Sequence, residues 1–310
     1  MKIFVSGSIA YDIILDYPGR FADHINPGKV HALSLSFTVS NVKKSIGGTA
    51  GNIAYNLAMM GLKSELLTAV GADGIEILKQ YRSMSIDIGL SKISKQPTAA
   101  AYVMTDSVDN QISGFHPGAA MEAVKLPKVS SKDWAIIAAE NPRNMTALAR
   151  HYQKNNVKYI FDPGQAITAL SKSQMRECIK GATIVVGNDY EIDYIFRSNA
   201  PQPPLNLRGR VGGVIVRTLG PKGSEIIMPN GKKMKIGIAK AQNAVDPTGA
   251  GDAYRAGLMT GIVKGFDLKR SCQFGATAAV FAVEKYGTQN HKFNYDILKY
   301  RHNKNFREKI

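Results

Sequence analysis

The chain has 310 residues, of which 44% are hydrophobic and 21% are charged. These proportions are ordinary for a globular protein and supply enough apolar material for a large core. The two cysteines, Cys178 and Cys272, lie far apart without CxxC spacing, which argues against both a disulfide framework and a thiolate metal site. No apolar run approaches the length of a membrane helix, so we expect no membrane association.

The net charge is +16 at pH 7. Such an excess of positive charge can favour anionic partners, including nucleotides and nucleic acids. The lysines are scattered, however, apart from a basic tail between Lys299 and Lys309, and no RNP, zinc-finger or KH pattern accompanies them. We interpret the charge as a solvated basic surface and expect no nucleic-acid partner; a nucleic-acid-binding protein is the alternative that the charge alone motivates.

Strand-like and helix-like segments alternate along most of the chain. The opening apolar stretch, Ile3–Ser8, lacks a cleavage-site pattern, so it predicts a first strand and a cytoplasmic protein, not a signal peptide. A helix is predicted at Ala50–Met60, before Gly61, which is a natural helix end. Short apolar runs predict five further strands, at Leu66–Val70, Ala135–Ala139, Tyr159–Phe161, Ile184–Val186 and Val214–Arg217.

Helical patterns fill the positions between and after these strands. Short, nearly continuous apolar strands separated by helices are typical of a parallel sheet that helices cover on both faces. The predicted fold class is therefore α/β, with a three-layer core. The further helices are expected at Ala147–Gln153, Gln174–Lys180, Ala250–Lys264 and Thr277–Glu284.

Two regions depart from this rhythm. Residues 29–46 and 98–116 both contain stretches in which every second residue is apolar, the second around an Asp109-Asn110 turn. Such alternation predicts half-exposed strands, and we expect a small β-sheet that serves as a lid or an oligomer interface. The whole chain, 1–310, is expected to be one domain, with lid segments at about 12–46 and 98–118.

Apolar side chains in the first lid segment suggest how the lid is covered. Leu33, Leu35, Phe37 and Val39 alternate with polar residues. An exposed apolar strand face invites pairing with another surface. We expect two copies of the chain to associate through their lids.

The segment Asp246-Pro247-Thr248-Gly249-Ala250-Gly251-Asp252 carries the strongest chemical signal. Small residues at 249–251, directly before a helix, let three backbone N–H groups turn toward one point, which attracts phosphate. Asp252 would then accept the proton of an attacking hydroxyl, and an ordinary carboxylate pKa would suffice. The fragment alone fits equally well a turn capped by Thr248, in which Asp252 only complements the helix dipole.

This segment resembles the C-terminal signature of the ribokinase/PfkB carbohydrate-kinase family. An N-terminal signature matches as well, because Gly47-Gly48-Thr49-Ala50-Gly51-Asn52 is similar to the family's Gly-Gly…Asn segment. Gly48 and its neighbour would let a ligand approach the backbone closely, and Asn52 offers both a donor and an acceptor to a sugar hydroxyl. The resemblance implies a ribokinase-like core that binds a phosphate acceptor at these residues.

Two further motifs resemble the donor side of the same family. Asn188-Asp189-Tyr190-Glu191 is similar to the family's Asn-x-x-Glu motif, which implies that Glu191 helps to organise magnesium and that Asn188 lies by the nucleotide. Thr218–Gly223 is similar to the family's nucleotide loop, which implies ATP contacts from Thr218, Gly220 and Gly223. The four motifs follow the family's order and extend over most of the chain.

Finer matches resemble the nucleoside-kinase, adenosine kinase-like branch of the family. By that resemblance Asp12 would hold the ribose hydroxyls, since a carboxylate can bind a furanose diol with both oxygens; a polar residue at a strand end is the plainer alternative. The same resemblance implies that Gln111 approaches the substrate or the nucleotide from the lid and that Gln165 contacts the acceptor. Exposed loop glutamines would look the same.

The sequence thus predicts an ATP-dependent kinase that phosphorylates the 5′-hydroxyl of purine ribonucleosides (adenosine, inosine, guanosine) in purine salvage. Its expected partners are a nucleoside, ATP with Mg²⁺, and a second copy of the chain; whether a monovalent cation activates stays open. The alternatives are a sugar kinase of the same family, acting on ribose or fructose derivatives, and a nucleotide-binding protein without activity. Arg255 could bind phosphate or face solvent, and the tract Tyr286–Gln289 receives no role.

Overall fold

The computed structural model describes residues 1–25, 28, 34–198 and 213–308. Its centre is an eight-stranded sheet with the order β14-β13-β12-β11-β10-β9-β1-β4. The six strands from β12 to β4 are parallel, and β13 and β14 extend the sheet in antiparallel fashion. The strands are β1 (Ile3–Ser6), β4 (Glu65–Leu67), β9 (Trp134–Ile137), β10 (Lys158–Phe161), β11 (Ile184–Asn188), β12 (Val214–Thr218), β13 (Ser224–Ile227) and β14 (Lys233–Ile236).

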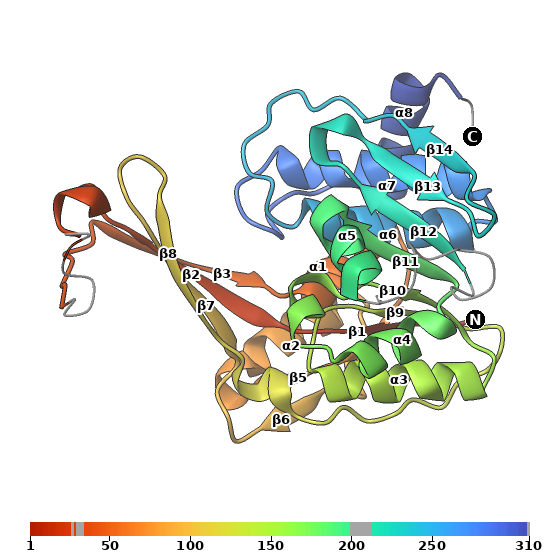
Figure 1. Cartoon of the computed structure of the whole chain (residues 1–310), viewed down its shortest axis with the longest axis horizontal. Helices are drawn as coiled ribbons and strands as arrows, with labels where there is room; N and C mark the ends of the chain where they lie inside the picture. Colours follow the sequence, from red (N-terminus) through yellow and green to blue (C-terminus); the bar gives the residue numbers. More distant parts are fainter. Residues whose placement is uncertain (26–27, 29–33, 199–212, 309–310) are drawn as a thin grey trace.

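Helices cover both faces of this sheet, which confirms the predicted three-layer α/β core (Figure 1). Alternate strand residues supply the two apolar clusters: Val5 packs in the first and Phe4 in the second. The first face is covered by α1 (Thr49–Met59), α2 (Ile75–Ser83), α6 (Ala250–Val263), α7 (Leu268–Val283) and α8 (Tyr295–Phe306), and the second by α3 (Pro142–Lys154), α4 (Lys172–Lys180) and α5 (Asp189–Ser198). Among the described helices, none has the length and apolar character needed to span a bilayer.

The expected strands and helices of the core are found, with shifted ends and two larger differences. The strand expected at Leu66–Val70 is divided at Thr68, whose carbonyl accepts a hydrogen bond from the Lys92 amide at 2.9 Å. The pairing of β4 with β1 ends there, and the chain continues as β5 (Ala69–Gly71), which pairs with β6 (Lys92–Ser94). The helix expected from Thr277 is the second half of α7, which begins at Leu268.

A separate four-stranded sheet, the lid, projects from the core as an arm (Figure 1). Its order is β3-β2-β7-β8, with β2 and β7 parallel and the outer pairs antiparallel. The strands are β2 (Ala10–Asp16), β3 (Asn41–Gly47), β7 (Ala99–Thr105) and β8 (Gln111–His116). The predicted hairpin turn is confirmed at Asp109, which adopts a φ of 63°.

The first lid segment differs from its prediction. Residues 29–33 lie outside the described residues, and residues 34–39 form no strand, so the strand expected there is wrong. Phe37 instead packs against Tyr17 and Phe21, with ring centroids 4.6 and 5.4 Å away. The apolar side chain therefore serves an aromatic cluster at the outer end of the lid, not an exposed strand face.

Candidate active site

The carboxyl ends of the parallel strands meet at one edge of the central sheet, where ligands of open α/β sheets bind. Asn188 ends β11, Thr218 ends β12, and the two residues are direct partners in the sheet. Asp162 directly follows β10 at the same edge. Helices α1 and α6 also begin here, because Asn52 in the first turn of α1 donates a hydrogen bond to Asp252 in the first turn of α6.

Asp252 lies at the centre of this constellation. The Asn52 Nδ2 atom donates to its Oδ2 atom at 2.8 Å. Burial raises the pKa of the Asp252 carboxyl to about 7; Arg255 and the Asn52 hydrogen bond lower it, whereas Asp162 and Asp12 raise it. The pKa of this carboxyl therefore lies above the ordinary value that would already suffice for the proposed base, and the main cause is burial.

Arg255, one turn after Asp252, does not face solvent. Its side chain is 8% exposed and forms an ion pair with Asp162, to whose Oδ1 atom the Nη2 atom donates at 2.7 Å. The Glu191 carboxylate lies 3.9 Å from the same nitrogen. One buried cation thus lies among three carboxylates, which is the arrangement that a buried charge requires.

Asp12 approaches the site from the lid. It lies on β2, opposite Ser45 of β3, and a Cβ atom on Gly47 would come within 2.2 Å of its Oδ2 atom. Burial, and secondarily Asp246, raises the pKa of the Asp12 carboxyl. Asp12 therefore belongs to the same electrostatic cluster as Asp252, at the base of the lid.

The glycine before α1 has a structural reason as well as an expected ligand role. Gly48 has a φ of 90°, and a Cβ atom there would lie 2.6 Å from the Ser8 carbonyl oxygen. Only glycine fits this close crossing of two backbones. The open backbone expected for a ligand is thus partly occupied by the turn between β1 and β2.

The first residues of α6 determine how many backbone amides are free to bind a phosphate. Gly249 is the N-cap residue, in the left-handed region, and no side chain caps the helix, so the alternative of a Thr248 cap is not observed. The Ala250 amide donates to the Pro247 carbonyl at 3.1 Å. Of the three amides expected to face an anion, that of Ala250 therefore already has a partner, which leaves those of Gly249 and Gly251.

Asn188 and Glu191 form a reciprocal cap at the start of α5. The Glu191 amide donates to Asn188 Oδ1 and the Asn188 amide donates to Glu191 Oε2, both at 2.8 Å. This is the arrangement of a capping box. Burial, with Asp162 second, raises the pKa of Glu191. The described residues contain no group of three or more metal-ligating side chains, so Glu191 offers a single carboxylate and not a metal cage.

The predicted nucleotide loop is the turn between β12 and β13. The Leu219 amide donates to the Gly223 carbonyl at 2.8 Å and closes it. Gly220 and Gly223 have φ values of 56° and 89°, and the space around the Gly220 Cα is open. The Thr218 hydroxyl donates to the Gly187 carbonyl at 3.4 Å. Thr218, Gly220 and Gly223 thus share one turn beside Asn188.

Neither predicted glutamine has a hydrogen bond to the carboxylate cluster among the residues that the structure describes. Gln111 pairs with Thr105 at the outer end of the lid, whereas Asp12 pairs with Ala101 near its base. Gln165 is exposed on a short 3₁₀ helix that follows β10, and its side chain has no hydrogen bond to any residue that the structure describes.

Two further residues, one of which contacts Asn52 of the site, carry no sequence signal. Gln289, in the tract without an assigned role, donates through Nε2 to Asn52 Oδ1 and to the Tyr81 hydroxyl, both at 2.9 Å. Glu140 directly follows the Ala135–Ala139 segment, and burial raises the pKa of its carboxyl to about 8. Neither an isolated glutamine nor an isolated glutamate forms a pattern by which sequence reasoning could find it.

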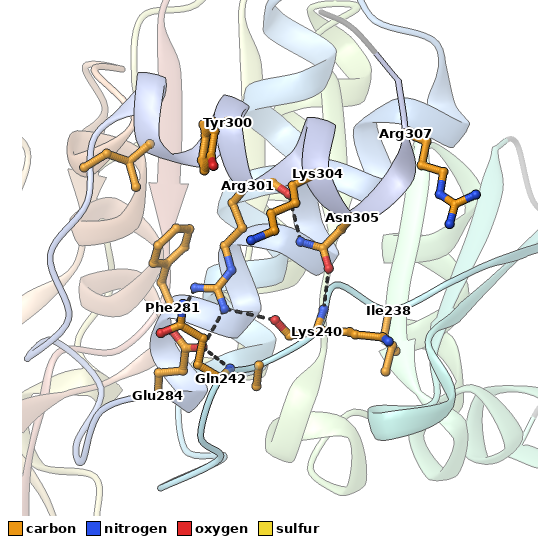
Figure 2. Close-up of a pocket in the computed structure, with 12 residues that line it drawn as sticks. Ile238, Lys240, Gln242, Phe281, Glu284, Tyr300, Arg301, Lys304, Asn305 and Arg307 are labelled. Atoms are coloured by element: carbon orange, nitrogen blue, oxygen red, sulfur yellow. Dashed lines mark hydrogen bonds and ion pairs between the residues drawn. The ribbon is translucent and has the colours of Figure 1, made fainter.

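A cavity of about 710 Å³ lies outside this constellation, between α8 and the segment that follows β14 (Figure 2). Arg301 lines this cavity, and its guanidinium donates to both carboxylate oxygens of Glu284 and to the Lys240 carbonyl. The Asn305 side chain accepts from the Lys240 amide at 2.7 Å. These contacts fix the last helix to the chain that leads into the Asp246–Asp252 segment.

Comparison with known proteins places this geometry in a family. The sequence profile of the pfkB family of carbohydrate kinases matches residues 2–293. The chain belongs to the pfkB family of carbohydrate kinases. This pfkB-family chain is accordingly a phosphotransferase that acts on a hydroxyl group.

Relatives and solved structures agree with this family assignment. The chain is 36% identical over 261 residues to a nucleoside kinase of Methanothermobacter thermautotrophicus, covering 82% of this chain and 83% of the relative. The structure of the Methanocaldococcus jannaschii nucleoside kinase superposes with a TM-score of 0.85 at 30% identity, covering 98% of this chain and 99% of the other. The Burkholderia thailandensis nucleoside kinase in complex with inosine superposes with a TM-score of 0.84 at 27% identity, covering 99% and 100%.

Proposed function

We propose that this kinase transfers the γ-phosphoryl group of ATP to the 5′-hydroxyl of purine ribonucleosides such as adenosine, inosine and guanosine, as in purine salvage. The observation that carries the proposal is the half-buried Asp252 carboxylate, held by Asn52 at 2.8 Å and close enough to Asp12 for the two charges to interact. Its pKa of about 7 matches a general base that works near neutral pH. The similarity to nucleoside kinases, one of them solved with inosine, supports a nucleoside as the acceptor.

The proposed reaction moves one proton and one phosphoryl group. Asp252 accepts the proton of the 5′-hydroxyl while the new O–P bond forms and the bond between the γ-phosphorus and the bridging oxygen breaks, releasing ADP. The amides of Gly249 and Gly251, at the positive end of α6, stabilise charge on the moving group. ATP arrives with Mg²⁺ coordinated to its phosphates, and Glu191 contributes one carboxylate nearby.

The ribose is proposed to lie between the lid and α1. Asp12 would accept hydrogen bonds from the 2′- and 3′-hydroxyls, beside Gly48. Asn52 would donate its second Nδ2 hydrogen, since the first points to Asp252, while its Oδ1 atom accepts from Gln289. We propose that Gln111 and Gln165 contact the purine ring of the nucleoside only if the lid moves toward the core when the nucleoside binds.

ATP is proposed to lie along the turn at Thr218, Gly220 and Gly223, next to Asn188. These residues come from adjacent strand ends at the same edge as Asp252. The turn offers backbone groups and open space at Gly220, which suits phosphates and a ribose edge better than a specific base. Activation by a monovalent cation stays open.

A panel of acceptors assayed with MgATP tests the proposal. We expect purine ribonucleosides to be the best substrates, with a heavy loss for 2′-deoxynucleosides because Asp12, half-buried before the nucleoside binds and covered by it afterwards, would lose a hydrogen-bond partner. Detection of the 5′-monophosphate by chromatography identifies the product. If ribose or fructose 6-phosphate outperforms every nucleoside, the enzyme is a sugar kinase of the family. If ATP binds and no acceptor is phosphorylated, the kinase proposal fails.

We further propose that two copies associate through the lid, although Phe37 and Val39 do not form the strand face that first suggested it. Exposed apolar side chains instead lie on the lid face opposite Asp12, at Val42, Tyr102 and Ile112. A Val42→Lys/Ile112→Lys variant should turn a dimer into a monomer in sedimentation velocity at micromolar protein. A wild-type chain that sediments only as a monomer would refute the dimer.

A further inference from the structure

The Asn52 amide is held on both sides in a fixed direction. An ionised carboxylate can only accept hydrogen bonds, so Asn52 must turn its Nδ2 atom toward Asp252 and its Oδ1 atom away from it. The Oδ1 atom accepts from Gln289 Nε2 at 2.9 Å. If the Asn52 amide were reversed, two oxygens would face each other at Asp252 and two N–H groups would face each other at Gln289.

Gln289 is in turn held by a buried hydroxyl. Tyr81, on α2, is fully buried, and its hydroxyl lies 2.9 Å from Gln289 Nε2 and 3.3 Å from Oε1. A Cβ atom on Gly51 would come within 2.4 Å of this hydroxyl, so the absence of a side chain there leaves room for it. The chain of contacts runs from α2 through Gln289 to α1 and ends at Asp252.

The backbone around Gln289 is anchored independently of its side chain. The Thr288 hydroxyl donates to the Ile46 carbonyl at 2.8 Å, and His291 Nε2 lies 2.8 Å from Asn56 Oδ1. The Tyr55 hydroxyl donates to the His291 carbonyl at 2.5 Å. Changing the Gln289 side chain should therefore leave the segment in place and affect what the amide touches.

We propose that Gln289, backed by Tyr81, is a positioning residue that fixes the direction of the Asn52 amide and thereby keeps the Asp252 carboxylate ready to accept a proton. The inference rests on the proposed role of Asp252 as the base. Asn52 is 4% exposed, so water cannot readily replace the contact that Gln289 supplies.

The expected signature is a pH effect. In the free protein, burial raises the pKa of Asp252, and the Asn52 hydrogen bond, together with Arg255 of the same helix, opposes that rise; Asp162, after β10, and Asp12, on the lid, add to it. Loss of the Asn52 contact therefore raises the pKa of the Asp252 carboxyl. The base is then protonated over a wider pH range, and activity is lost at low pH but not at high pH.

Gln289→Met tests this, because methionine keeps the length and removes the donor. We expect the acid limb of kcat/KM to shift up by about 0.5–1 pH unit, so that kcat/KM falls about 3–10-fold at pH 6 and stays near wild type at pH 9. Tyr81→Phe should shift it in the same direction by less. Asn290→Ala is the matched control in the same segment: among the residues that the structure describes, its side-chain amide donates only to the Tyr286 carbonyl, so the acid limb should not move.

A double variant and an NMR titration test whether Gln289 acts on Asp252 through Asn52. In an Asn52→Ala background, Gln289→Met should cause no further shift, because the residue through which it acts is gone. A shift of equal size there, or a Gln289→Met limb that coincides with wild type, overturns the inference. A ¹³C NMR titration of the Asp252 carboxyl in the ligand-free protein gives the same midpoint without turnover. If that titration shifts while no acceptor is phosphorylated, the proposed function fails and the positioning survives.

Discussion

The two ends of the candidate site are built from different parts of the chain. The proposed acceptor end depends on side chains: the half-buried Asp252, the Asn52 amide and two further carboxylates contact or influence one another. The proposed donor end depends more on backbone groups, in the turn from Thr218 to Gly223 and in the two amides that the Asn188 and Glu191 side chains cap. Substitutions at the acceptor end should therefore change chemistry, and those at the donor end should first change local structure.

Asp252→Asn should have the largest effect. We expect kcat to fall by about 10²–10⁴-fold, the usual contribution of a general base, while nucleoside affinity in calorimetry stays near wild type. Asparagine keeps the size of the side chain and the fold. A variant that retains more than about a tenth of wild-type turnover would remove Asp252 from the mechanism and erase the chemical distinction between the two ends.

Among these variants, Arg255→Met should lower the free energy of unfolding the most. It leaves Asp162, 3% exposed, without its cation, which costs about 3–5 kcal/mol for a broken buried pair. Denaturant unfolding measures this free energy. Lys79→Ala is the control, because its partner Glu76 is exposed and such pairs contribute under about 1 kcal/mol. Equal costs for the two variants would mean that burial of the Arg255 pair is not what makes it matter.

The pH dependence of the unfolding free energy should reveal the raised pKa of Asp252 directly. The folded pKa of Asp252, about 7, lies above its unfolded value, so the folded state binds the proton more tightly and Asp252 loses its stabilising contribution as pH rises through 7. Asp252→Asn removes this loss. We expect the variant to gain about 1–3 kcal/mol relative to wild type between pH 5 and pH 9. Parallel pH–stability curves for the two proteins would show that Asp252 titrates normally.

Glu191→Gln should give the smallest and most selective effect. Glutamine can still complete the capping box with Asn188, so unfolding free energy should change by less than about 1 kcal/mol. The lost charge should raise the magnesium concentration needed for half-maximal rate more than the nucleoside KM. Glu191→Ala, which removes the cap as well, is the comparison. An unchanged magnesium dependence in both variants would make Glu191 purely structural.

The sequence predicted the core well because its signals are local. Apolar runs set the strands, and glycines at 249 and 251 mark the start of α6. It failed where tertiary contacts decide. Phe37 alternates with polar residues as a strand residue would, yet it packs into an aromatic cluster. Arg255 is an unremarkable position in the helix sequence, and only the fold brings Asp162 to it from residues far away in the chain.

The candidate site shows the same division. Asp252, Asn52 and Asp12 were found from motifs, and the structure brings all three together. The cap between Asn188 and Glu191 could have been found, since an N-cap residue followed three positions later by glutamate is a sequence signature of a helix start. Gln289 and Tyr81 could not, because a single glutamine and a single tyrosine on different elements form no pattern until the chain is folded.

The parallel pairing of β2 with β7 has a consequence for how the protein is made. Ala10 pairs with Ala99, so the centre of the lid joins two segments between which α1, β4 and α2 of the core lie in sequence. Until β7 is synthesised, β2 and β3 form only a two-stranded ribbon, which is marginally stable in water. An unpaired edge of this kind invites association with other nascent chains. Lys43 and Lys44, on β3 at the sheet edge, are charges of the sort that discourage it.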